Sequence, residues 1–270
     1  MLTLSRIALL LIAPLVAYAP RAARVPVESA ALYFSDHRRP MTGDDYRRYT
    51  GAGVLFCRDD SGVPQKAAAS WLIGSHRLVM MNAHNFIDRK ARMMRAVSNC
   101  YFQINGRNYE FDPDSLQLGV DSHATALHIT DDWSLVRLKQ ATDATVLPQP
   151  IPQPSQLSTG PENLTVTMVS PAGHSNFRGP GSGPNSIESC TIHEIDPPSE
   201  DSIRRARHDC NDGFGGSGSG LFDDAGHLLA MQSASLDMNR RLPFDVELHY
   251  GSALLIEGKL LEAIIEAAQK

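Results

Sequence analysis

The chain has 270 residues and a formal net charge of −5 at pH 7, with 42% hydrophobic and 20% charged residues. This size and composition indicate a folded protein with a sizeable core, and they exclude a strongly basic nucleic-acid-binding protein. The 17 prolines and 20 glycines favour short strands joined by turns over long helices. The dense basic run RRAR at residues 204–207 lies among acidic residues, which is typical of a solvated segment.

The N-terminus has the pattern of an export signal. Arg6 precedes an apolar run over residues 7–19, which is too short to span a bilayer comfortably. The tripeptide AYA at residues 17–19 has the small-x-small form of a cleavage site. We therefore assign residues 1–23 to a signal peptide and residues 24–49 to a polar leader. This assignment predicts a secreted or periplasmic protein with no stable membrane span.

Short apolar or alternating runs, bounded by turn residues, predict strands along the rest of the chain. In the first half the predicted strands cover residues 53–57, 67–73, 77–81, 96–104, 108–111 and 133–138. The repeated prolines of LPQPIPQPSQ then predict a stiff extended connector over residues 146–160. In the second half the predicted strands cover residues 164–170, 189–194, 203–208, 220–222, 227–233 and 250–255. An amphipathic helix is predicted over residues 258–270, with an apolar face made of Leu260, Leu261, Ile264 and Ile265.

The loop GGSGS at residues 215–219 places a serine where the backbone turns tightly. Glycine tolerates positive φ and has no Cβ, so such a loop lets the chain approach a reacting carbonyl closely. The amides of Gly215 and Ser217 are a candidate oxyanion hole, and the Ser217 hydroxyl is the candidate nucleophile. Ser219 is the competing nucleophile, but the Gly-x-Ser-Gly register belongs to Ser217.

A histidine and an aspartate complete the set of candidate catalytic residues. His84 ends the apolar run LVMMNAH, and Asp132 leads into the alternating segment DWSLVRL. Each also has a purely structural interpretation, as a buried bonded histidine and as a turn residue. With Ser217, however, they supply a base, an orienting carboxylate and a nucleophile in the chain order found on double β-barrels. The same order disfavours a serine esterase or lipase of the α/β-hydrolase type, in which the serine comes first.

These three segments resemble the sequence boxes of the chymotrypsin/trypsin-like serine proteases. The tripeptide NAH at residues 82–84 is similar to the T-A-A-H box, and the loop at residues 215–219 is similar to the G-D-S-G-G box. The segment at residues 132–138 is similar to D-I-A-L-L-x-L, which selects Asp132 over Asp131. The finer match is to the bacterial glutamyl-endopeptidase-like branch, where the serine box often reads G-N-S-G-S-P.

The resemblance implies an all-β fold of two six-stranded antiparallel barrels with a C-terminal α-helix. We expect the first barrel at residues 50–145, a linker at 146–160, and the second barrel with the helix at 161–270. It also implies a monomeric serine endopeptidase that forms an acyl-enzyme on polypeptide substrates and needs no cofactor. The alternative is a catalytically weak or inactive homologue that acts as a binding protein, because Gly216 and Gly220 replace the aspartate and proline of the serine box.

The four cysteines, at positions 57, 100, 190 and 210, allow three pairings. Sequential pairing keeps each bridge inside one of the two implied barrels, so we expect disulfides Cys57–Cys100 and Cys190–Cys210. Each would stabilise the fold by about 3 kcal/mol. Metal ligation is disfavoured, because the sequence has no CxxC or HxxxH pair.

The resemblance places the primary specificity pocket along four residues, Asn211, Asp212, Gln232 and Ser233. Ser233 is expected to lie where the substrate backbone pairs with the enzyme. Asp212 can select a basic side chain or serve as a turn residue in an Asn-Asp-Gly sequence. The glutamyl-specific members usually have a histidine where Gln232 stands, so the preferred substrate side chain stays open.

Overall fold

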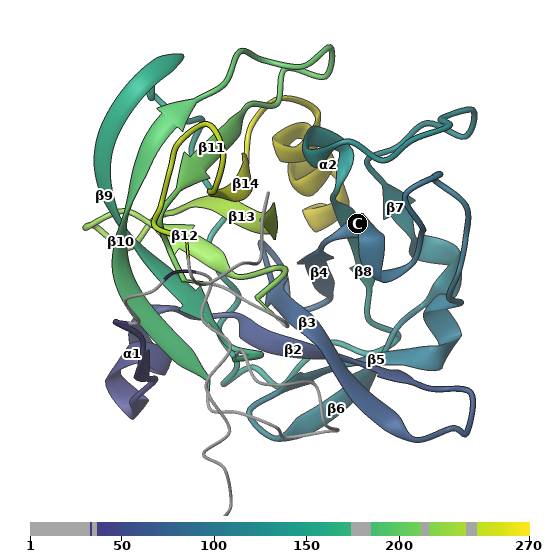
Figure 1. Ribbon diagram of the computed structural model, residues 1–270. Coiled ribbons are helices and arrows are strands. Elements are labelled where there is room, and N and C mark those ends of the chain that lie inside the picture. Colours follow the sequence, from purple (N-terminus) through teal and green to yellow (C-terminus); the bar gives the residue numbers. More distant parts are fainter. Residues whose placement is uncertain (1–32, 34–36, 174–184, 212–215, 236–241) are drawn as a thin grey trace, which may run out of the picture.

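The computed structural model describes residue 33 and residues 37–173, 185–211, 216–235 and 242–270. The predicted signal peptide, Asp212 and Gly215 lie outside these ranges. Within the described residues the chain forms two antiparallel seven-stranded sheets, each rolled on itself, and a helix at the C-terminus (Figure 1). The predicted fold of two six-stranded barrels with a C-terminal helix is confirmed, and each sheet carries one additional two-residue strand.

The first barrel follows the strand order β6-β5-β2-β3-β4-β8, with the short β7 paired to β8. A bridge between Phe111 and Leu138 joins the two ends of this order and closes the barrel. The burial pattern has the period of two that a half-buried strand requires, as in β5, where Cys100, Phe102 and Ile104 are buried. The strands are β2 (Ala52–Arg58), β3 (Pro64–Leu72), β4 (Leu78–Met81), β5 (Cys100–Ile104), β6 (Arg107–Glu110), β7 (Gln117–Leu118) and β8 (Ser134–Arg137).

The second barrel follows the order β10-β11-β14-β13-β12-β9, and β9 pairs again with β10 to close the ring. The leader adds β1 (Arg39–Pro40), which pairs with Ser186 and Ile187 at the start of β10, followed by helix α1 (Gly43–Arg48). The sequence did not predict these two short elements or β7, because a hydrophobic period cannot be recognised over so few residues. The barrel strands are β9 (Gly160–Ser170), β10 (Ser186–Ile195), β11 (Arg205–His208), β12 (Gly220–Phe222), β13 (Leu228–Ser235) and β14 (Gly251–Leu255).

The basic run that the sequence singled out lies on β11 and the residue before it, and carboxylates neutralise it. Arg204 pairs with Glu257 at 2.7 Å, and Arg207 pairs with Asp196 at 2.9 Å. Arg205 also contacts Asp196. Each guanidinium of the run therefore has an acidic partner within the barrel.

Helix α2 (Gly258–Ala268) packs against the junction of the two barrels. Leu260, Leu261 and Ile264 are buried, as the apolar face predicted. Ile265 is a correction to that prediction: its side chain is 42% exposed, and Ala267 takes the buried position instead. Ala267 lies three residues after Ile264, so it shares the helix face that is directed at the barrels.

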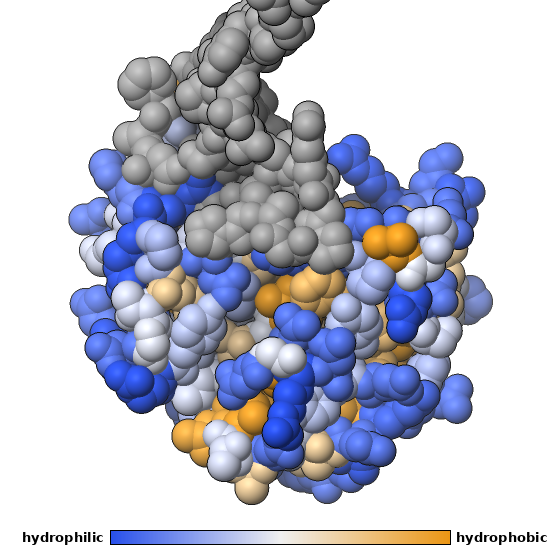
Figure 2. Space-filling model, turned by 90° about the horizontal axis from the view of Figure 1, so that it is seen from below, coloured by the Kyte–Doolittle hydropathy of each residue, from blue (hydrophilic) through white to orange (hydrophobic). Residues whose placement is uncertain are grey.

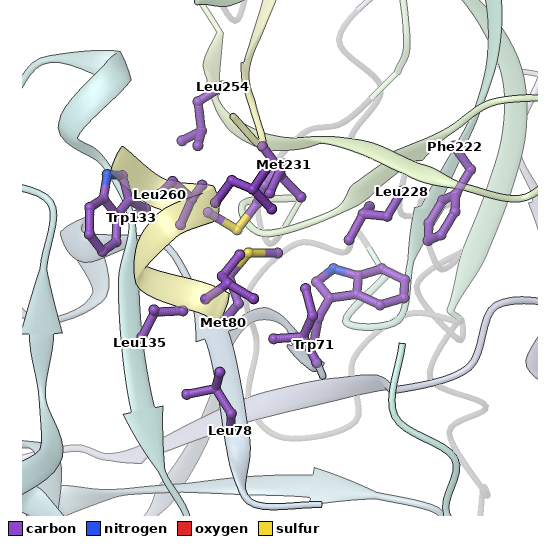
Figure 3. Close-up of a cluster of buried hydrophobic side chains, with 14 of the residues drawn as sticks. Trp71, Leu78, Met80, Trp133, Leu135, Phe222, Leu228, Met231, Leu254 and Leu260 are labelled. Atoms are coloured by element: carbon purple, nitrogen blue, oxygen red, sulfur yellow. The ribbon is translucent and has the colours of Figure 1, made fainter. Parts of the chain in front are cut away.

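A cluster of buried apolar side chains fills the space between the barrels (Figure 3). The first barrel contributes Trp71 and Met80 among others, the second contributes Phe222 and Met231, and α2 contributes Leu260. Each barrel also has its own interior cluster. Because close-packed interiors resist sliding, the shared cluster holds the two barrels, and any site between them, in one geometry.

Few large apolar side chains are exposed in the part of the chain that the structure describes. Seen from below, the described residues present a mainly hydrophilic face with apolar groups in small separate patches (Figure 2). The exposed apolar side chains include Met93, Met94, Leu147 and Leu248. In the described part of the chain no helix is both long and apolar enough to cross a membrane.

Candidate active site

His84 lies just beyond the end of β4, in a single 3-10 turn formed by Ala83–Asn85. β4 pairs with β8 in a register that sets Met81 opposite Ser134. The residues that follow β4 therefore meet those that precede β8, and Asp132 is among them. The Asn82 amide group donates to the Asp132 carbonyl oxygen at 3.0 Å, which ties the two segments together.

The Asp132 carboxylate binds His84 through both of its oxygens. Its Oδ2 accepts a hydrogen bond from His84 Nδ1 at 2.7 Å, and its Oδ1 accepts one from the His84 backbone N–H at 2.8 Å. Asp132 is buried, with 3% of its surface exposed. The first contact leaves the Nε2 atom of His84 as the one that can accept a proton from a nucleophile.

The pKa of His84 is raised above its ordinary value of 6.5. Burial opposes protonation of the ring, but the negative charge of Asp132 and its hydrogen bond together outweigh that effect. Asp131 does not take part: its carboxylate accepts from the Thr130 hydroxyl, and burial raises its pKa. His84 is thus paired with Asp132, the residue that the resemblance to the D-I-A-L-L-x-L box selected.

Ser217 lies in a tight turn that is held against the first barrel. Its carbonyl oxygen accepts from the Ala69 N–H at 2.9 Å, and the next carbonyl, of Gly218, accepts from the Trp71 indole N–H at 2.8 Å. Gly218 has φ +81°, and a Cβ at this position would lie 2.1 Å from the Ala69 carbonyl oxygen. Only glycine satisfies both the backbone angle and this close approach.

Ser217 and Ser219 occupy different environments. Ser219 is fully buried, and its hydroxyl bonds to the Ser170 hydroxyl at 2.6 Å. Ser217 is partly exposed and lines the same cleft as His84 and Asp132. The Ser217 hydroxyl donates to the Ser233 carbonyl at 3.5 Å and makes no hydrogen bond to His84 in this structure. Catalytic hydrogen bonds are often long before a substrate binds, so the accessible serine remains the candidate nucleophile.

The predicted pocket residues have mixed positions. Asp212 and the predicted oxyanion donor Gly215 lie outside the described residues. Asn211 and Gln232 are buried, and neither side chain lines the cleft that holds His84. Ser233 does line it, and the Ser233 hydroxyl donates to Asp132 Oδ2. The sequence did not predict this contact, since no local pattern links Ser233 to Asp132 across the two barrels.

His208 is a buried titratable group that the sequence did not single out. Burial lowers its pKa to about 4, so the ring is neutral at pH 7. Its Nδ1 accepts from the Cys210 backbone N–H at 3.2 Å, which leaves Nε2 to donate to the Gln232 side-chain oxygen at 2.6 Å. The side-chain oxygen of Gln232 is therefore occupied by His208 in the barrel interior and does not face the cleft.

The cleft between the barrels has a volume of about 720 Å³. The second barrel contributes Ser217 and residues 233–235 to its wall. The first barrel contributes three separate segments: the β2–β3 hairpin, the turn and loop after His84, and residues 127–129 before Asp132. The candidate catalytic residues lie where these walls meet.

Both expected disulfides are present. Cys57–Cys100 links β2 to β5 in the first barrel, and Cys190–Cys210 links β10 to the segment that leads toward the serine loop. Within the described residues no group of three or more His, Cys, Asp or Glu side chains is placed to hold a metal ion.

No family model and no curated protein matches this chain. Among solved structures, it is similar to a Glu endopeptidase in complex with MPD, with a TM-score of 0.59. That similarity covers 88% of this chain and 100% of the other, at 13% sequence identity. The chain has the chymotrypsin-like fold. At this identity the likeness establishes the two-barrel fold of a serine endopeptidase, and any activity rests on the residues of the cleft.

Proposed function

We propose that this chain is a secreted serine endopeptidase that uses Ser217, His84 and Asp132 as a catalytic triad. The observation that supports this most directly is the doubly bonded His84–Asp132 pair, which shares one cleft with a serine held in a glycine turn. Three residues from distant parts of the chain are gathered at one solvent-accessible place, with the residue types that acyl transfer requires.

The proposed reaction follows from the proton positions. His84 Nε2 removes the hydroxyl proton of Ser217 as Oγ attacks the carbonyl carbon of the scissile bond. Asp132 keeps the ring in the tautomer with hydrogen on Nδ1 and stabilises the imidazolium that forms. The amides of Gly215 and Ser217 would bind the oxyanion of the tetrahedral intermediate.

His84 then gives its proton to the leaving amine, so the peptide bond breaks and an ester to Ser217 remains. A water molecule, deprotonated in turn by His84, attacks this ester and releases the new carboxylate. No other reactant is needed for the cycle. Export of the protein is the companion proposal, supported by the two disulfides and by the signal pattern at residues 1–23.

Labelling with a fluorophosphonate probe tests the proposal, because the probe reacts with a serine only when a base activates it. We expect stoichiometric labelling of Ser217, located by peptide mass mapping, and hydrolysis of peptide substrates as well as of matched esters. Ser219→Ala is the matched control and should be labelled normally. A folded protein that is not labelled, or one that cleaves esters alone, would contradict the proposal, the first outcome favouring a binding protein.

A further inference from the structure

The two walls of the cleft differ sharply in charge. Among the described residues, the second-barrel wall consists of Ser217 and residues 233–235, which are small and uncharged. The first-barrel wall carries four cationic side chains, Arg58, Lys66, Arg89 and Arg95. This concentration of positive charge is unexpected in a chain whose net charge is −5.

The carboxylates in the same wall are already engaged. Asp132 is bound to His84, as described above. Asp59 closes the β2–β3 hairpin by accepting from the Ser61 and Val63 backbone N–H groups at 3.0 and 2.9 Å. Neither carboxylate forms a salt bridge with Arg58, Arg89 or Arg95 among the described residues, and the four cations outnumber the two carboxylates.

The arginines of the cleft also differ from those of the basic run at residues 204–207. Arg204, Arg205 and Arg207 each pair with a carboxylate. By contrast, Arg58 lies over the Tyr101 ring, and Arg95 donates to the Asn85 carbonyl oxygen. Neither residue forms a salt bridge within the described part of the chain.

Arg89 and Lys66 extend the same surface. Arg89 is exposed and forms no salt bridge with another described residue. The Lys66 ammonium donates to the Ala172 carbonyl at 2.7 Å, and burial lowers its pKa. A nearby carboxylate would favour the charged form of Lys66, so an anionic ligand would be stabilised at this wall.

The position of β3 relates this wall to the scissile bond. Ala69 on β3 donates to the Ser217 carbonyl, so β3 passes directly beside the candidate nucleophile. Lys66 lies three residues before Ala69, or about 10 Å of strand at roughly 3.3 Å per residue. An extended substrate spans this distance with about three residues. If the acyl part of the substrate follows residues 233–235, the part that leaves lies against the cationic wall.

We propose that this enzyme prefers polypeptides with Asp or Glu within the first three residues after the scissile bond. The inference rests on the proposed protease function and concerns the leaving segment, independently of the side chain that the primary pocket accepts. Charge complementarity of this kind raises the rate of encounter and fixes the register of the bound chain. Its effect weakens as salt screens the charges.

Matched peptides that differ only after the scissile bond test the preference. We expect a peptide with Glu at the second and third leaving positions to have a kcat/KM about 10-fold higher at low salt than its Gln counterpart, as a few partly exposed charge pairs allow. The ratio should fall toward 1 in high salt. The double variant Arg58→Gln/Arg95→Gln should have a lower ratio of the two kcat/KM values at low salt. Arg107→Gln is the control: it removes an exposed arginine that is paired with Asp143 outside the cleft, and it should leave the ratio unchanged.

A binding measurement separates failure of this inference from failure of the proposed function. In Ser217→Ala, fluorescence anisotropy should show tighter binding of the Glu peptide than of the Gln peptide, by a similar factor. Equal affinities and equal kcat/KM values for the two peptides would overturn the inference while the protease proposal stands. If the unsubstituted protein is neither labelled nor active but the Glu peptide still binds more tightly, the preference for acidic ligands would stand and the proposed protease activity would be wrong.

Discussion

The two halves of the candidate site are built by different means. On the first barrel, His84 and Asp132 form a charged pair in which both carboxylate oxygens bind the histidine. On the second barrel, Ser217 is held almost entirely by its backbone, through the glycine turn and the contact with Ala69. The first half depends on side-chain chemistry, and the second on the absence of a side chain at Gly218.

The difference follows from what each half must carry. A buried carboxylate loses its hydration and needs hydrogen bonds and an opposite charge in exchange, so Asp132 is surrounded by donors from His84 and Ser233. A serine hydroxyl is neutral and needs only to be placed. Substitutions in the first half should therefore change proton transfer, whereas substitutions in the second should change geometry.

The largest effect is expected from removing the reacting groups. Ser217→Ala and His84→Ala should each lower kcat by about 10⁶-fold, and the double variant should be no worse, because the groups act as a unit. Ser219→Ala should keep its activity and lose about 1–3 kcal/mol of stability, since it leaves the buried Ser170 hydroxyl unpaired. Activity that survives in Ser217→Ala and disappears in Ser219→Ala would show that Ser219, and not Ser217, is the nucleophile.

The next effect should come from the charge of Asp132. Asp132→Asn is expected to lower kcat by about 10⁴-fold, because the amide holds the wrong tautomer of His84. In the unchanged enzyme kcat/KM should rise with pH as His84 loses its proton, with a midpoint above 6.5. The variant loses the negative charge that raises this pKa, so its midpoint should move to lower pH. Asp131→Asn is the matched control, and an equal shift in both variants would contradict the pairing.

Removing each disulfide in turn allows the stability of the two barrels to be compared. The bridged residues are 43 positions apart in the first barrel and 20 apart in the second. Loop-closure entropy then gives a loss of about 4 kcal/mol when Cys57 and Cys100 are both replaced by serine, and about 3 kcal/mol for Cys190 and Cys210. Urea unfolding measures both losses. A larger loss in the second barrel would show that the Cys190–Cys210 bridge does more than close a loop.

A smaller loss of stability than that of either disulfide should come from Gly218→Ala, which tests the second half directly. The left-handed backbone angle and the contact with Ala69 should together cost about 2–3 kcal/mol. Gly62→Ala is the control, because Gly62 has a similar φ of +80° with nothing within 4 Å of a Cβ, and should cost about 1 kcal/mol. Fluorophosphonate labelling should fall in Gly218→Ala alone. The NMR titration of His84 should stay unchanged, and a shift there would show that the halves are not separable.

Local residue patterns were sufficient for the regular elements. The predicted strand at residues 220–222 coincides with β12, and the predicted helix begins where α2 begins, at Gly258. The apolar face of the helix was predicted except at Ile265, whose exposure depends on how far the barrels wrap around α2. β1, β7 and α1 were not predicted, because each is too short to show a hydrophobic period. The two strands are stabilised by pairing with a distant strand, and α1 by its capping contacts.

The sequence by itself determined the residues that can do chemistry and the backbone they need: a histidine after an apolar strand, an aspartate before another, and a serine beside Gly218. Only the tertiary structure decided that they meet. The register of β4 on β8 brings His84 to Asp132, and the shared cluster between the barrels brings Ser217 to both. It also gathered Arg58, Lys66, Arg89 and Arg95 from two segments into one wall. Short-range backbone preferences can be read from neighbouring residues, whereas such convergence depends on long-range pairing and packing, which no local pattern contains.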